Sequence, residues 1–271
     1  MARAVRQLQP RLVEKPWGRE ALPPLFGPTG GTPIGEIWFE DEASLSLLVK
    51  YIFTSERLSI QVHPDDAAAR ASGLPRGKEE IWYILDCEPG ATLGIGLKRP
   101  TTPQDFRLAA LDGSIEDMID WKAVQPGDCY FIPAGTVHAI GAGIVLAEIQ
   151  QNADITYRLY DYGRPRELHL DQGLSVSLLE PYRRPVIHAP IGTKETTLTP
   201  DGAPFTLTLC HWDIGAMTLP ATDQLWFTPL DGHGTINGAN WSKGECWLLD
   251  GQCLIEALAP TSALLATSTR I

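Results

Sequence analysis

Short apolar runs separated by turn residues dominate the hydrophobic pattern of this chain. Residues 58–62, 81–85 and 130–132 are typical runs, because they are rich in β-branched and aromatic side chains and are bounded by polar or turn-forming residues. The 22 prolines and 25 glycines punctuate such runs. This spacing predicts an all-β sandwich or barrel rather than an alternation of strands and helices.

Two segments carry helical signals instead. Residues 64–70 begin with a proline and two aspartates, which favour a helix start, and Gly73 marks its end. In residues 103–121, apolar side chains recur at roughly helical spacing, although Gly113 weakens the pattern; they are Phe106, Leu108, Leu111, Ile115, Met118 and Ile119. We predict both helices as insertions around a β core.

Candidate chemistry begins with Gln61 and His63, two residues apart in a β-patterned run. Side chains at this spacing on a strand project to the same face, so both can reach one ligand. Glu80 opens the next apolar run, which reads as a neighbouring strand. Far downstream, residues 133–136 read as a tight turn that presents His138. Two imidazoles, a carboxylate and an amide oxygen together predict one metal site.

The second half of the chain echoes the first without these ligands. Residues 244–251 resemble residues 127–135 in layout, and residues 224–228 echo residues 79–83. No histidine follows Gly251, and Leu225 stands where Glu80 would fall. We therefore predict two related β modules, a metal-binding one over residues 1–168 and a degenerate one without metal ligands over residues 169–271.

Charge and composition exclude several classes of function. The formal net charge of −11 disfavours nucleic-acid and anionic-membrane binding, and an anionic substrate would need a local cationic pocket. No apolar run approaches the ~20 residues of a membrane-spanning helix. The first seven residues lack the apolar core of a secretory signal, so we expect a cytoplasmic protein, monomeric or homodimeric.

The number and spacing of the cysteines are also informative. The five cysteines form no C-x-x-C pair and are odd in number, which argues against a disulfide framework and a thiolate zinc site. We expect them to be small core residues.

Several motifs resemble a known family. Gly127-x5-Pro133-x-Gly135-x2-His138 is similar to the second signature motif of the cupin superfamily, and Gln61-x-His63 with Glu80 resembles the first, with glutamine replacing its leading histidine. Within cupins, that glutamine resembles the type I mannose-6-phosphate isomerases, in their short bacterial form. Further matching strings are Leu48-Val49-Lys50, Gly77-Lys78-x-Glu80-x-Trp82-Tyr83 and Ala147-Glu148-Ile149-Gln150-Gln151-Asn152-x-Asp154-x-Thr156-Tyr157-Arg158.

The resemblance implies a mainly β fold of two cupin-like, jelly-roll barrel modules with a few helical insertions. It also implies reversible isomerisation of mannose 6-phosphate and fructose 6-phosphate through a cis-enediolate, at one zinc ion held by Gln61, His63, Glu80 and His138. A divalent cation beside the C1 and C2 oxygens would act as a Lewis acid. By ligand softness, other divalent transition metals also suit this set.

Further residues receive roles from the same resemblance. Arg158 would stabilise the enediolate, while Glu148, Asp154 and Lys78 are candidates for proton transfer. Ser59 and Lys50 match phosphate contacts of the family. Structural roles are the alternative for each: Arg158 could pair with Asp161, Lys50 could be a strand lysine, and Ser59 could hydrogen-bond within a turn.

Two other functions are weighed against the isomerase. A cupin oxygenase would use iron held by histidines and a carboxylate, with open positions for oxygen. A non-catalytic sugar-binding or sensing cupin would keep the barrel without a proton-transfer group. Gln61 disfavours the first, and the presence of Glu148, Asp154 and Arg158 disfavours the second.

Overall fold

The computed structural model describes residues 5–42 and 45–269. The start of the stretch assessed for a secretory signal, Met1 to Ala4, lies outside the described residues. Within the described ranges the fold is mainly β, as predicted, and four antiparallel sheets contain its strands. None of the described helices combines the length and the apolar character that a membrane crossing requires.

The first half of the chain forms most of two sheets that face each other. In spatial order the seven-stranded sheet contains β13 (Ile187–His188), β9 (Asp128–Ile132), β6 (Glu80–Cys87), β11 (Ile144–Gln151), β4 (Leu47–Phe53), β3 (Ile34–Glu40) and β2 (Gln9–Arg19). The five-stranded sheet contains β12 (Tyr157–Tyr160), β5 (Ile60–Val62), β10 (His138–Ile140), β7 (Thr92–Leu97) and β8 (Ile119–Ala123).

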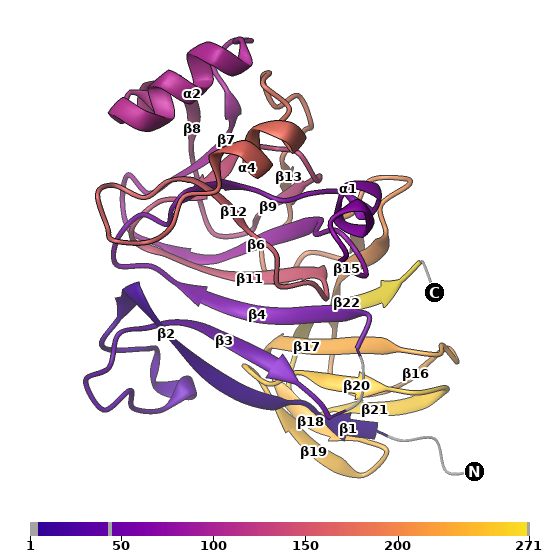
Figure 1. Ribbon diagram of the computed structural model, residues 1–271. Helices are drawn as coiled ribbons and strands as arrows, with labels where there is room; N and C mark the ends of the chain where they lie inside the picture. The colour runs from indigo at the N-terminus through magenta and orange to yellow at the C-terminus, as the bar shows by residue number, and fades with distance from the viewer. Residues whose placement is uncertain (1–4, 43–44, 270–271) are drawn as a thin grey trace.

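The second half forms two further sheets. The six-stranded sheet contains β1 (Val5–Gln7), β20 (Trp247–Leu249), β17 (Leu225–Asp231), β22 (Thr261–Ser268), β15 (Phe205–Trp212) and β14 (Thr196–Thr197). The four-stranded sheet contains β16 (Gly215–Leu219), β21 (Cys253–Ala257), β18 (His233–Ile236) and β19 (Ala239–Ser242). Figure 1 shows β17, β20, β21, β18, β19 and β1 below β4, and helices α2 (Pro103–Asp112) and α4 (Leu170–Val176) at the opposite end of the molecule.

Buried apolar clusters join the sheets in a stack. One face of the seven-stranded sheet packs on the five-stranded sheet, through residues such as Ile84 and Ile95. Its other face packs on the six-stranded sheet, through residues such as Tyr51 and Trp226. Since side chains alternate between the faces of a strand, each central strand serves both cores. A third cluster joins the six-stranded and four-stranded sheets.

Both predicted insertions contain helices, with one correction, whereas a further helix, α4, was not predicted from the sequence. α1 (Asp66–Ala71) begins at Asp65, which accepts a hydrogen bond from the Ala68 N–H. The predicted helix over residues 103–121 is too long: α2 (Pro103–Asp112) ends at Gly113, whose φ is 89°, and a short α3 (Ile115–Met118) follows. The chain then enters β8, because Ile119 takes an extended conformation and packs into the core.

Two short elements complete the description. α4 (Leu170–Val176) packs with α2 against the outer face of the five-stranded sheet, and η1 (Pro24–Phe26) is a single 3-10 turn. The two segments that echo the first half form β17 and β20, which pair with each other. The predicted division at residue 168 stays a prediction. Two strands join sheets formed mainly by the other half of the chain: β1 lies in the six-stranded sheet and β13 in the seven-stranded sheet.

Candidate metal centre

Three buried side chains meet between the seven-stranded and five-stranded sheets. His63 follows β5, Glu80 opens β6 and His138 opens β10, and each is about 1% exposed. Their ligand atoms all lie within 4.8 Å of one another. His63 Nε2 is 3.3 Å from Glu80 Oε1, and His138 Nε2 is 3.8 Å from Glu80 Oε2. These three residues could hold a metal ion, as the sequence predicts.

The two histidines are oriented by backbone carbonyls. His63 Nδ1 lies 2.7 Å from the carbonyl oxygen of Ile155, and His138 Nδ1 lies 2.8 Å from that of Thr136. Because a carbonyl oxygen can only accept, each Nδ1 carries the proton and donates it. Both Nε2 lone pairs therefore face the centre, which is the tautomer that a metal ligand needs.

The centre also leaves buried polar atoms without hydrogen bonds. His63 Nε2 and both carboxylate oxygens of Glu80 have no hydrogen-bond partner among the described residues. Lys78 Nζ lies 2.8 Å from Glu80 Oε1 as an ion pair, without hydrogen-bonding geometry. Buried unpaired polar atoms are rare in native proteins. A buried imidazole nitrogen and a carboxylate without hydrogen bonds fit a transition-metal ion such as Zn²⁺.

The electrostatics keep these groups in their ligating states. Burial, with the charge of Lys78, lowers the pKa of His63 to about 3, although Glu80 opposes the shift. Burial also lowers the pKa of His138. For Glu80, burial alone would raise the pKa, but Lys78 and the two histidines hold it well below its usual range. At neutral pH the site contains two neutral imidazoles and one carboxylate.

Gln61 lies beside this cluster on β5. Its Cα is paired with His138 on one side and with Arg158 of β12 on the other, so the three side chains project to one face of the sheet. Gln61 Nε2 lies 3.3 Å from His138 Nε2, and Ser59 Oγ lies 3.1 Å from Gln61 Oε1. Gln61 therefore lies beside the cluster, with its amide nitrogen rather than its oxygen toward His138, and its role as a ligand stays a prediction.

The opposite wall carries Glu148 and Lys50, on the neighbouring strands β11 and β4. Lys50 Nζ donates to Glu148 Oε1 at 3.0 Å and to Gln150 Oε1 at 2.6 Å, and Trp82 Nε1 donates to Glu148 Oε2 at 2.9 Å. Burial and the charge of Glu80 raise the pKa of Glu148, against the effect of Lys50. Burial opposes the charge on Lys50, but Glu148, Glu36 and Glu80 raise its pKa above the ordinary value.

The remaining candidates lie at different distances from the centre. Arg158 is half-buried; its Nη1 donates to the Glu167 carbonyl at 2.7 Å, and its buried Nε has no hydrogen-bond partner. Asp161 forms its ion pairs with Arg164 and Arg166 rather than with Arg158. Asp154 is exposed, next to the Ile155 whose carbonyl holds His63. The roles assigned to Arg158 and Asp154 stay predictions.

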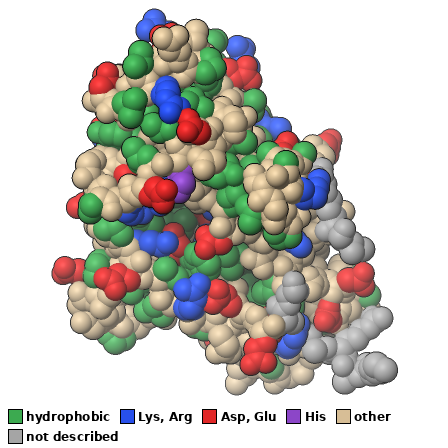
Figure 2. Space-filling model, in the orientation of Figure 1, with side chains coloured by type: hydrophobic (Ala, Val, Ile, Leu, Met, Phe, Trp, Pro, Cys, Tyr) green, Lys and Arg blue, Asp and Glu red, His purple; other side chains and the backbone are tan. Residues whose placement is uncertain are grey.

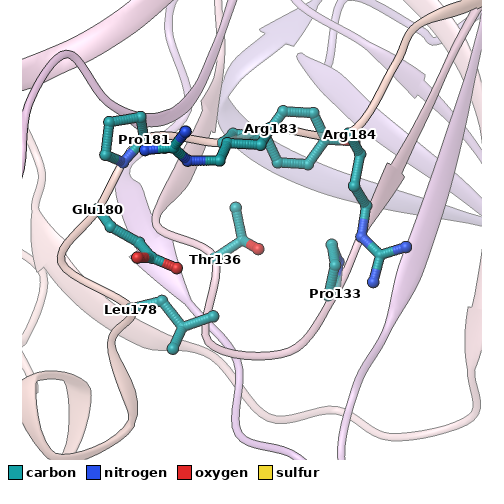
Figure 3. A pocket seen from close by; sticks show the side chains of 9 residues that line it. Pro133, Thr136, Leu178, Glu180, Pro181, Arg183 and Arg184 are labelled. Carbon is teal, nitrogen blue, oxygen red and sulfur yellow. The ribbon is translucent and has the colours of Figure 1, made fainter.

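A separate pocket of about 250 Å³ opens beside the turn that presents His138. Figure 3 shows Pro133 and Thr136 of this turn together with Glu180, Arg183 and Arg184 from the segment after α4. None of the predicted ligands lines it. Figure 2 shows that Lys/Arg and Asp/Glu side chains are interspersed over the visible face, including the rim of a hollow near its middle.

Sequence reasoning missed several partners of these residues. Trp82 is two residues after Glu80, and Gln150 is two residues after Glu148, so the rule of alternating faces could have found both. The carbonyls of Ile155 and Thr136 carry no sequence signal, because every residue has one. All five cysteines are free; four of them are buried, as predicted, but Cys87 is only partly buried.

Comparison with known proteins places the chain in a family, although no protein-family model matches it. The mannose-6-phosphate isomerase ManA of Bacillus subtilis is 39% identical over 216 residues, which cover 75% of this chain and 68% of that protein. The probable mannose-6-phosphate isomerase GmuF of the same organism is 36% identical over 165 residues, covering 55% and 52%. The match thus spans about half the length of GmuF.

Solved structures agree in fold. A mannose 6-phosphate isomerase from Bacillus subtilis is 26% identical with a TM-score of 0.77, over 96% of this chain and 98% of that one. A zinc-bound mannose 6-phosphate isomerase has a TM-score of 0.73 at 12% identity, over 98% of this chain and 100% of that one, a likeness that shows the fold. The chain therefore belongs to the mannose-6-phosphate isomerase family, because it is 39% identical to ManA over 216 residues and brings His63, Glu80 and His138 together.

Proposed function

We propose that this chain interconverts mannose 6-phosphate and fructose 6-phosphate at one zinc ion. The observation that carries the proposal is the convergence of His63, Glu80 and His138, with buried atoms left open, in a chain 39% identical to ManA. Gln61 would complete the ligand set through its amide oxygen. A zinc-bound structure of the same fold supports the choice of metal.

The reaction needs a group that stabilises negative charge and a group that moves a proton between C1 and C2. The bound metal would supply Lewis-acid stabilisation of charge on the sugar oxygens. Arg158, on the same sheet face as Gln61, would add a permanent positive charge beside the enediolate.

Two buried groups are suited to proton transfer. Glu148 has a raised pKa, which brings a carboxyl group closer to neutral pH and makes it a better general acid and base. Lys78 is buried 2.8 Å from Glu80 and is the second candidate. Asp154 is exposed and would need to approach the substrate from the loop before β12.

The sugar phosphate requires cations in a chain of net charge −11. Lys50 was predicted for this role with Ser59, yet in the structure its ammonium is buried against Glu148 and Gln150. A phosphate contact by Lys50 would therefore need one of these hydrogen bonds to open.

The test is a coupled assay of mannose 6-phosphate conversion on protein of known metal content. Activity should disappear on chelation and return with zinc. Turnover that survives complete removal of metal would contradict the zinc centre. A fully zinc-loaded protein without turnover would contradict the isomerase activity and favour a chain that binds sugars without converting them.

A further inference from the structure

The amide of Gln61 lies between a histidine and a serine. Since His138 Nδ1 donates to the Thr136 carbonyl, His138 Nε2 carries the lone pair, and Gln61 Nε2 donates to it across 3.3 Å. The other end of the amide, Oε1, accepts a hydrogen bond from the Ser59 hydroxyl at 3.1 Å. Ser59 is 3% exposed.

This orientation of the amide conflicts with a bound ion. The ion takes the His138 lone pair, so Gln61 loses its acceptor, and an amide nitrogen is not a metal ligand whereas an amide oxygen is. Rotation of the amide by half a turn about its last torsion exchanges the two ends. That torsion is broad and roughly two-fold for glutamine, so the rotation needs no change in the rest of the side chain.

Ser59 can serve the amide in both orientations. A serine hydroxyl donates one hydrogen bond and accepts others. It donates to Gln61 Oε1 in the present orientation and would accept from Gln61 Nε2 once Oε1 faces an ion. Without this hydroxyl, the rotated amide would lose the acceptor that Ser59 offers to its N–H.

We propose that Ser59 is a positioning residue that turns the Gln61 amide and so sets the affinity of the metal centre. This role differs from the phosphate contact predicted for Ser59, and it rests on the zinc site of the proposed function. It makes Ser59 part of the metal-binding machinery although it does not touch the ion.

The test measures zinc affinity directly, by competition with a chromophoric chelator on the purified chain. Ser59→Ala should raise the zinc dissociation constant by about 10- to 100-fold, as is typical when a ligand's orienting partner is lost. Ser59→Thr, which restores a hydroxyl, should recover most of the affinity. Ser262→Ala removes an equally buried serine hydroxyl in β22 and should leave zinc affinity unchanged.

A double-mutant cycle then asks whether Ser59 acts through Gln61. In a Gln61→Ala background, Ser59→Ala should change the zinc dissociation constant less than two-fold. An undiminished effect in that background would overturn the proposal, as would unchanged zinc affinity in the single variant. If Ser59→Ala does not fold, Ser59→Thr and Ser59→Val form a pair of equal shape that differs in the hydroxyl and allows the same comparison.

Inorganic phosphate separates the two roles of Ser59. If Ser59→Ala weakens phosphate binding and leaves zinc affinity unchanged, Ser59 is a phosphate contact and the positioning role is wrong. Wild-type protein that binds no zinc would instead contradict the metal centre of the proposed function. If the wild type binds zinc and Ser59→Ala binds it equally well, only the positioning role of Ser59 is contradicted.

Discussion

At the residue scale, the candidate centre combines features that a sequence displays with features that it hides. Gln61, His63 and His138 could be predicted because a two-residue spacing on a strand and a tight turn are local patterns. The pairing of Lys50 with Glu148 could not, because it depends on strand order: β11 lies beside β4, 98 residues away in sequence. The same holds for the register that brings Arg158 opposite Gln61.

Replacing His138 with alanine should remove most bound metal and activity while leaving the fold largely intact. Its imidazole is one of the three converging ligands and projects into the interior from a strand whose neighbours remain paired. Metal content and far-UV circular dichroism measure the two effects. His233→Ala, at an exposed position on β18, is the matched control and should retain the metal. Full metal occupancy in His138→Ala would remove it from the ligand set.

Replacing Arg158 with alanine should keep the metal but lower kcat/KM by about 10²- to 10³-fold, the usual effect of losing one group that stabilises transition-state charge. Steady-state kinetics on zinc-loaded protein measure this. Arg107→Ala, which breaks only an exposed ion pair with Asp171, should leave kcat/KM unchanged. A rate equal to wild type would give Arg158 a structural role.

Glu36 should make the stability depend on acid pH. Burial alone raises its pKa, but Lys50 and Lys15 hold it below the ordinary value of 4.5. A lowered folded-state pKa means that the contribution to stability is present above pH 4.5 and is lost as the pH falls through the folded pKa. In Glu36→Gln, the free energy of unfolding should decrease less steeply as the pH falls through this window. The slope should differ from that of the wild type by up to about 1.4 kcal/mol per pH unit, the value for one proton.

Urea titrations at several pH values measure this slope. Glu56→Gln is the control, because the Glu56 side chain is 65% exposed and its contact with Arg164 is long. Identical slopes for Glu36→Gln and the wild type below pH 4.5 would contradict a lowered pKa.

At the element scale, the turn before β10 is hydrogen-bonded to the end of β5, so the segments that carry His138 and His63 are held together. Gly135 has a φ of 82° and its N–H donates to the His63 carbonyl at 2.8 Å, so the turn that presents His138 is attached to the strand end that presents His63. The sequence predicted this turn from its glycine and proline. It did not predict where the helix over residues 103–121 ends. Ile119 fits the helical spacing of apolar residues, but in the structure it begins β8 and packs into the core.

Gly135→Ala should therefore weaken both stability and metal binding. A left-handed conformation costs a non-glycine residue about 1–2 kcal/mol, and the new Cβ would lie 2.9 Å from the Val176 carbonyl oxygen. Gly163→Ala is the control, because its φ is 79° but nothing lies within 4 Å of its Cβ position. Denaturation curves and zinc titrations should show a larger loss for Gly135→Ala in both measurements; equal losses would contradict the role of the turn.

At the scale of the whole molecule, one core joins the two halves of the chain. The largest apolar cluster contains Tyr51 and Phe131 from the first half and Trp226 and Leu248 from the second. The hydrophobic pattern predicts short apolar strands, but not which of them pack against each other. Packing between sheets depends on the fold as a whole, and a short apolar run does not specify its partner.

Leu248→Ala should destabilise the metal centre although it lies in the other half of the chain. Leu248 is fully buried, and truncating a buried leucine costs about 2–5 kcal/mol. Because the core is shared, zinc release and loss of β structure should shift to lower denaturant together. Leu254→Ala, at a side chain 44% exposed, should shift neither. Zinc release that keeps the wild-type midpoint would show that the halves unfold independently.

The position of β11 between β4 and β6 has a consequence for synthesis of the chain. Domains of a growing chain generally fold as units as they emerge, N-terminal first. Here β11, which connects β4 to β6 within the seven-stranded sheet, is synthesised after both of these neighbours. His138 is synthesised 75 residues after His63. A chain synthesised only as far as residue 137 has His63 and Glu80 but neither His138 nor β11. We therefore expect the candidate metal site to become complete only late in synthesis, once β11 has paired with β4 and β6.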